Sequence, residues 1–125
     1  MILDTNTLSA YADGVPEAIA AVDACSSLEL PVIVLGEYRY GIAHSRRHQA
    51  YEQWLDEFVL FTEVVDITEQ TTLWYAQLRS ELRNTGTRIP ANDIWIAALS
   101  RQHSLSVLSK DRHFDAVKGL RRVAW

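Results

Sequence analysis

The sequence has little of what disulfide-stabilised, secreted or membrane-spanning proteins depend on. It contains a single cysteine, Cys25, in 125 residues, so neither an intrachain disulfide nor a multi-cysteine zinc site is available. No apolar run approaches the roughly 20 residues of a membrane helix, and the first residues lack the basic start and apolar stretch of a signal peptide. Internal repeats and low-complexity segments are also lacking. These absences predict a cytoplasmic protein with no membrane role.

The composition is typical of one globular domain, and we expect residues 1–125 to form it. Hydrophobic residues make up 48% of the chain and charged residues 22%, and this length can bury roughly two thirds of the unfolded surface. The net charge of −4 argues against a protein that coats nucleic acid through general positive potential. That charge is uneven: residues 1–70 carry a net −9 and residues 71–125 a net +5. The split predicts an acidic and a basic side, or only charges collected on solvated helix faces.

Short apolar runs alternate with helical patterns along the chain. The runs that predict buried strands are residues 1–3, 32–34, 63–67, 106–109 and 122–125. The segments that predict helices are residues 16–25, 47–63, 68–84 and 93–104, the second of them through aromatic and leucine side chains spaced three and four apart. This alternation predicts a three-layer α/β/α sandwich with a central, mostly parallel sheet of about four to five strands.

Four acidic side chains fall where strands of such a sheet end and the next helices begin. They are Asp4 after residues 1–3, Glu37 after the run at 32–34, Asp93 at the start of the helix 93–104, and Asp111 after 106–109. In open parallel sheets, functional groups gather beyond the carboxyl ends of the strands. Asp4 and Asp93 are also typical helix N-caps, and Asp111 is typical of a turn. Glu37 is harder to explain as a cap, because glutamate is a poor one.

A divalent cation would account for carboxylates gathered in one place. Two ligands of one magnesium ion lie within roughly 4 Å of each other, where like charges repel by about 4 kcal/mol at an effective dielectric near 20. An empty cluster should therefore take up protons or attract metal. Oxygen ligands select magnesium or manganese over zinc. The pair His44 and His48 has a possible metal-ligand spacing, but beside two arginines it fits a solvated face better.

Such a cation, held with open coordination positions, is the usual device for activating water against a phosphodiester. Basic residues near the acids would then contact substrate phosphates, although each alone also fits an ordinary surface position. Lys110 and Arg112, which directly bracket Asp111, are the strongest of them. The predicted RNA-binding set is Arg39, Arg46, Arg47, Arg88, Lys110 and Arg112.

Four motifs together resemble those of PIN-domain ribonucleases, most closely the VapC-type toxins of prokaryotic toxin–antitoxin pairs. The motifs are LDTNTLS at 3–9, VIVLGEYRYGIAHS at 32–45, IPANDIWIAALS at 89–100 and LSKDRHF at 108–114. The first is unspecific alone, but the combination of the other three is specific. The resemblance covers essentially the whole chain and implies a PIN-like fold, RNA as substrate, and products with 5′-phosphate and 3′-hydroxyl ends.

The resemblance also implies roles for individual residues. Asp4, Glu37, Asp93 and Asp111 would be the catalytic acids that bind Mg²⁺, for which Mn²⁺ substitutes. Residues around them would support the acids: Thr5 and Asn6 beside Asp4, Ser109 where the family commonly has threonine, and Asp115 one helical turn after Asp111. Members of this kind form homodimers and are silenced by a cognate antitoxin protein. The aromatic side chains Tyr38, Tyr40, Tyr51, Trp54, Phe58 and Phe61 belong to those surfaces or to the core.

Three alternatives compete with this hypothesis. The start DTNTL approaches the D-x-D-x-T motif of haloacid-dehalogenase-type phosphatases, but Asn6 replaces the acid that carries the proton in that chemistry. A receiver-like magnesium-binding signalling module would need paired acids after the first strand, which this sequence does not offer well. A non-catalytic PIN-fold binding protein would not need acids at all four positions. The sequence therefore favours a metal-dependent endoribonuclease.

Overall fold

Five short strands form one parallel sheet in the computed structural model, which describes residues 1–125. The strands are β1 (Ile2–Leu3), β2 (Glu29–Pro31), β3 (Glu63–Val65), β4 (Val107–Leu108) and β5 (Arg122–Val123). Their order in the sheet is β3-β2-β1-β4-β5, and every neighbouring pair is parallel. The predicted parallel sheet of four to five strands is confirmed.

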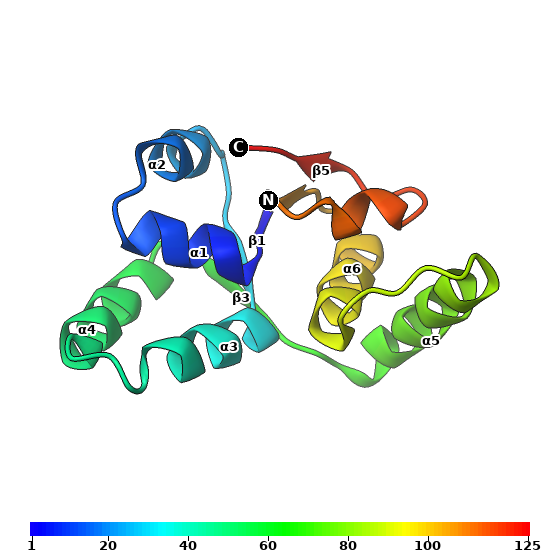
Figure 1. The fold of residues 1–125 in the computed structure, drawn as a ribbon, viewed down its shortest axis with the longest axis horizontal. Helices are drawn as coiled ribbons and strands as arrows, with labels where there is room; N and C mark the ends of the chain where they lie inside the picture. Colours follow the sequence, from blue (N-terminus) through cyan, green and yellow to red (C-terminus); the bar gives the residue numbers. More distant parts are fainter.

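Helices cover both faces of this sheet. They are α1 (Thr5–Ala12), α2 (Pro16–Asp23), α3 (Val32–Ile42), α4 (His48–Val59), α5 (Glu69–Asn84), α6 (Ala91–His103) and the 3-10 helix η1 (Arg112–Ala116). Figure 1 shows α1 to α4 on one side of the strands and α5 and α6 on the other. The chain moves outward from β1 to β2 and β3, then crosses back to β4 on the opposite side of β1. The three-layer architecture is therefore confirmed, with β1 and β4 flanking the point where the order reverses.

Burial explains why strands of only two or three residues are stable. Ile2, Leu3, Leu30 and Val107 have no exposed surface, as continuous apolar runs of a sheet covered on both faces should. Full burial of each such side chain stabilises the fold by about 1.5–3 kcal/mol. The sheet is thus held by the helices packed on it rather than by long ladders of backbone hydrogen bonds.

The predicted strand at residues 32–34 is wrong: this run opens helix α3, and the strand lies just before it, at Glu29–Pro31. The buried side chains Val34, Tyr38 and Ile42 recur every four residues and form the inner face of α3. The intrinsic helix cost of valine and isoleucine is below about 0.7 kcal/mol per residue, which burial of that face outweighs. Glu37 therefore lies in the middle of a helix and not directly after a strand.

The other predicted elements differ from the structure mainly at their ends. The helix predicted to reach residue 63 stops at Val59, and the side chain of Phe61 beyond it is 81% exposed. The helix predicted from residue 93 begins two residues earlier, at Ala91. None of the helices combines the length and the apolar character needed to span a membrane.

Candidate functional site

A pocket of about 420 Å³ opens where the strand order reverses, at the carboxyl ends of β1 and β4. The register pairs Leu3 with Leu108, so the next residues, Asp4 and Ser109, leave the sheet side by side. Crevices of this kind are where open α/β sheets bind ligands. The lining residues are Asp4, Thr5, Asn6, Glu37, Pro90, Ala91, Asn92, Asp93 and Asp111. The structure thus brings all four predicted acids, with Thr5 and Asn6, to one pocket.

Asp4 is almost completely buried, with 3% of its surface exposed. Its Oδ1 accepts a hydrogen bond from the Thr7 backbone N–H at 2.8 Å, so it caps α1 as well as lining the pocket. Its Oδ2 accepts a hydrogen bond from the buried hydroxyl of Ser109. Burial raises the pKa of Asp4 despite these hydrogen bonds, and the nearby charge of Asp111 adds to the rise. The ionised form of Asp4 therefore lacks a compensating positive charge.

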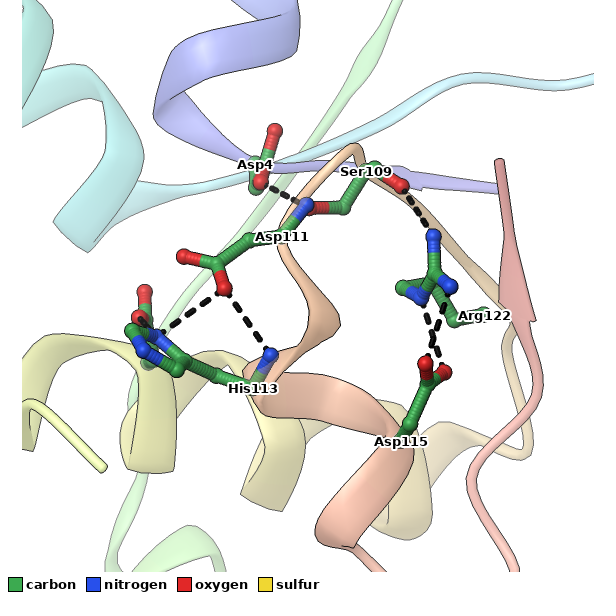
Figure 2. Close-up of polar contacts among 7 residues, drawn as sticks. Asp4, Ser109, Asp111, His113, Asp115 and Arg122 are labelled. Carbon is green, nitrogen blue, oxygen red and sulfur yellow. Dashed lines mark hydrogen bonds and ion pairs between the residues drawn. The ribbon is translucent and has the colours of Figure 1, made fainter. Parts of the chain in front are cut away.

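Ser109 joins two of the acids. While its hydroxyl donates to Asp4, its Oγ accepts a hydrogen bond from the Asp111 backbone N–H at 2.8 Å, and Figure 2 shows the three residues in this sequence. The Ser109 carbonyl oxygen accepts from Nη1 of Arg122 at 3.0 Å. Ser109 therefore fixes the direction in which the chain leaves β4 and carries Asp111 to the pocket.

Asp93 lies in the first turn of α6, but Pro90 and not Asp93 is the N-cap of that helix. The N-cap interpretation of Asp93 is therefore wrong, and its carboxylate is free to face the pocket. Burial raises the pKa of Asp93, and the charges of Asp111 and Asp4 raise it further, while a hydrogen bond to His113 opposes the rise. Asp93 therefore lies close enough to Asp111 and Asp4 to be affected by their charges.

His113 lies between two of these acids and is the residue that the sequence analysis missed. Its Nδ1 is 3.0 Å from Oδ1 of Asp111 and 3.4 Å from Oδ2 of Asp93. Asp111 is the N-cap of η1, and its Oδ1 accepts a hydrogen bond from the His113 backbone N–H at 2.9 Å. This turn brings the His113 side chain to the two acids. The signal was present: a histidine stands two residues after a predicted strand-end acid. Asp93, Asp111 and His113 offer ligand atoms within 4.8 Å of one another.

Glu37 reaches the same pocket from the middle of α3. Its Oε1 accepts a hydrogen bond from the Thr5 hydroxyl at 2.9 Å, so the first turn of α1 orients it. Asn6, next along α1, is exposed at the pocket rim. The pocket therefore draws on α1, α3, α6 and the loop after β4.

Asp115 does not line the pocket. It faces Arg122, whose Nε and Nη2 donate to its two carboxylate oxygens at 2.8 and 2.9 Å, as Figure 2 shows. This hydrogen-bonded pair lowers the pKa of Asp115. Together with the bond from Arg122 to the Ser109 carbonyl, it connects β5 to the loop that carries Asp111. We call Asp115, Arg122 and the Ser109 carbonyl the outer clamp.

The predicted RNA-binding bases have different surroundings. Arg39 is paired with Glu52, and its Nη2 also lies 3.8 Å from Asp56. Lys110 lies 4.2 Å from the centre of the Trp125 ring, whose Nε1 donates to the Thr7 hydroxyl at 2.8 Å. The remaining four, all exposed, are Arg46, Arg47, Arg88 and Arg112. Their contacts with RNA stay a prediction.

The donor set of the pocket fits a divalent cation. No lysine or arginine pairs with Asp4, Glu37, Asp93 or Asp111, and His113 is the only basic side chain within 4 Å of their oxygens. A buried carboxylate without a counter-charge has a raised pKa or binds a cation. Asp4 and Asp93 both have a raised pKa. Carboxylate oxygens suit hard cations. The arrangement is therefore suited to hold a cation next to an open, polar cavity.

Comparison with known proteins agrees with the family resemblance over nearly the whole chain. A sequence model of the PIN domain matches residues 1–120. The chain is similar to Ribonuclease VapC2 of Rickettsia felis, with 25% identity over 99% of this chain and 96% of that protein. It is 33% identical to Ribonuclease VapC4 of Mycobacterium tuberculosis over 69% of this chain and 68% of that protein.

A solved structure has the same fold. The structure described as DNA-bound VapBC from Salmonella typhimurium aligns with a TM-score of 0.88 and 28% identity, covering 99% of this chain and 96% of that one. These matches favour neither the receiver alternative nor the dehalogenase alternative. They agree with the strand order and with the acids at the carboxyl ends of the strands. The chain belongs to the PIN-domain family.

Proposed function

We propose that this chain, as one PIN domain over residues 1–125, is a metal-dependent endoribonuclease and the toxin of a VapBC-type toxin–antitoxin pair. The observation that carries the proposal is the convergence of four carboxylates, from four separate parts of the chain, on one pocket without a lysine or arginine partner. Family membership and the ribonuclease names of the relatives support the reaction class.

The cation we propose is Mg²⁺, with Mn²⁺ able to substitute, held by Asp4, Glu37, Asp93 and Asp111. When bound, it supplies the positive charge that activates a water molecule and stabilises the leaving oxygen of a phosphodiester. The all-carboxylate set favours these ions over zinc. His113 stands beside two of the acids and would interact with the same cation or its surroundings.

The chain's own groups would hold the acids in place for in-line attack on an RNA phosphorus. Ser109 and the start of α1 fix Asp4 by hydrogen bonds from both sides, and Thr5 orients Glu37. Asn6, which lines the pocket, would orient a water molecule or an RNA oxygen. Lys110 and Arg112 flank Asp111 and would attract neighbouring phosphates. Prior placement of these groups lowers the reorganisation needed during reaction.

The partners we propose are a cognate antitoxin and a second copy of this chain, in the cytoplasm. The relative from Salmonella typhimurium was solved as VapBC, which supports the antitoxin. Tyr40 and Phe61, exposed by 70% and 81%, supply apolar surface for protein contacts, whereas Tyr38 and Phe58 are core residues. The other two predicted contact aromatics, Tyr51 and Trp54, are partly buried against the core.

A cleavage assay on a panel of structured RNAs tests the proposal. We expect cleavage with Mg²⁺ or Mn²⁺, none with a chelator, and fragments with 5′-phosphate and 3′-hydroxyl ends. Asp93→Asn is the inactive control, because it keeps the size of the side chain and removes its charge. A folded protein that leaves every RNA intact with either metal would favour the non-catalytic binding alternative.

A further inference from the structure

A second, larger hollow of about 930 Å³ lies between α5 and α6 and is also lined by residues 86–89 of the loop that joins these helices. We call it the α5–α6 groove. Ala91 lines both this groove and the acidic pocket, so the two hollows adjoin at this residue. An extended chain that lies in the groove would therefore end beside the acids.

The groove concentrates positive charge on a chain whose net charge is −4. Arg79, Arg83 and Arg88 line it, and no aspartate or glutamate does. None of these arginines has a carboxylate partner within 4 Å, whereas three arginines elsewhere do: Arg39, Arg101 and Arg122. Arg83 and Arg88 also donate no side-chain hydrogen bond and are exposed, so both are available to a ligand.

Between the arginines the groove is lined by apolar and aromatic groups. Tyr75 contributes to it and is fixed by stacking on Trp95, with ring centroids 3.9 Å apart and planes inclined by 18°. Arg79 donates to the Tyr75 hydroxyl, and its guanidinium carbon lies 5.7 Å from the centre of the Tyr75 ring. Leu82 and Ile89 line the groove beside them. A groove that combines arginines with apolar and aromatic side chains matches a single strand, whose phosphates and bases are both accessible.

We propose that the α5–α6 groove binds the single-stranded RNA segment next to the cleaved phosphodiester. In this arrangement Arg83 and Arg88 contact phosphates, and the apolar and aromatic lining residues contact bases. This inference rests on the proposed ribonuclease function and adds to it the path of the substrate.

Electrostatics favours RNA over a protein occupant. Four carboxylates in the pocket repel phosphates, so a strand that enters the pocket needs cations directly outside it. The groove, which shares Ala91 with the pocket, supplies Arg79, Arg83 and Arg88. An acidic peptide would match the charge of the groove but does not need a binding site that adjoins the acidic pocket.

The test measures binding without cleavage. Fluorescence anisotropy with a short, fluorescein-labelled single-stranded RNA of mixed sequence, in a chelator, compares wild type with the double variant Arg83→Ala/Arg88→Ala. We expect at least roughly tenfold weaker binding and a salt-dependence slope smaller by about 1.4, because each phosphate contact to a single strand contributes about 0.7. Arg83→Lys/Arg88→Lys, which keeps both charges, should retain most of the slope.

The matched control is Lys118→Ala/Arg121→Ala, which removes the same charge from exposed positions outside the groove. We expect it to weaken binding by less than about twofold. Circular dichroism and thermal unfolding establish that both double variants are folded.

Equal weakening by the two double variants, or none by the groove variant, would overturn the proposal. A groove variant that binds RNA normally but no longer self-associates or binds an antitoxin would also overturn it and identify a protein interface. These outcomes are separable from failure of the proposed function. If wild type cleaves RNA while the groove variant binds and cleaves equally well, only the groove assignment fails; if wild type cleaves no RNA, the ribonuclease proposal fails.

Discussion

The acidic pocket and the outer clamp both contain aspartates, but the pKa values of these aspartates are shifted in opposite directions. In the pocket, burial raises the pKa of Asp4 and of Asp93, and no arginine or lysine is paired with either. In the clamp, Arg122 donates twice to Asp115 and lowers its pKa. Asp111 and Asp115 are one helical turn apart in the sequence, yet they belong to different regions.

The direction of the pKa shift distinguishes carboxylates that stabilise the fold through an arginine partner from carboxylates that are available to a ligand. Glu81 is a second example of the first kind: Arg101 donates to both of its oxygens, at 3.2 and 2.8 Å, and lowers its pKa. A carboxylate paired in this way has its charge compensated by the protein itself. A buried carboxylate without such a partner is retained at a cost to stability, which a functional role explains.

The largest effect should come from removing one pocket charge. Asp93→Asn or Asp4→Asn should lower RNA cleavage by more than about 100-fold, since loss of a group that only orients a metal ligand already costs about 10- to 100-fold. Thermal stability without metal should not drop, because an uncompensated charge is removed. Activity near that of wild type in either variant would contradict the assignment.

Metal should stabilise the pocket and leave the clamp unaffected. Mg²⁺ or Mn²⁺ at about 100 times its dissociation constant should raise the free energy of unfolding by about 2.7 kcal/mol, and a chelator should reverse this. The increase should vanish in Asp93→Asn and persist in Asp115→Asn. A similar increase in all three proteins, measured by denaturant unfolding, would place the bound ion elsewhere.

Ser109→Ala tests the connection between Asp4 and Asp111. It removes a hydrogen bond to Asp4 and leaves the Asp111 N–H without its acceptor, so cleavage should fall by about 10- to 100-fold. Ser100→Ala is the matched control, since Ser100 is also buried and donates to the Leu105 carbonyl, away from the pocket. Each variant should lose about 1–3 kcal/mol of stability. Equal activity losses would mean that destabilisation alone explains the effect.

The smallest effect is a contrast in pH dependence between Asp4→Asn and Asp115→Asn in metal-free protein. The pKa of Asp4 is raised above 3.8, so wild type should lose stability relative to Asp4→Asn as the pH rises above that value. The pKa of Asp115 is lowered, so wild type should gain stability relative to Asp115→Asn as the pH rises toward 3.8. Urea unfolding across acidic pH measures both differences; the same sign for both would remove the contrast.

Sequence patterns predicted the layers, the parallel sheet and the four acids of the pocket. Asp4 and Asp111 were predictable because they follow the short apolar strands β1 and β4 almost directly. Glu37 was found with the wrong local structure: a run of β-branched residues suits a buried strand and a buried helix equally, and tertiary packing chose the helix. Glu37 nevertheless lines the predicted pocket, because α3 begins at the carboxyl end of β2, on the same side of the sheet as Asp4 and Asp111.

The sequence can single out a candidate residue such as His113, but the partners that depend on turn geometry or on distant pairing could not be predicted. His113 reaches Asp93, 20 residues away, only through the 3-10 turn after Asp111. Asp115 has the spacing of a pocket residue, but the return of the chain through β5 places Arg122 beside it. Local spacing fixes which face of an element a residue occupies, whereas the partner on that face comes from the fold.

Anomalous diffraction from crystals grown with Mn²⁺ tests the central claim most directly. We predict one or more strong anomalous peaks in the pocket, within ligand distance of Asp4, Asp93 and Asp111, and none at Asp115. Peaks only on the outer clamp or elsewhere on the surface, with the pocket carboxylates free of metal, would contradict the account.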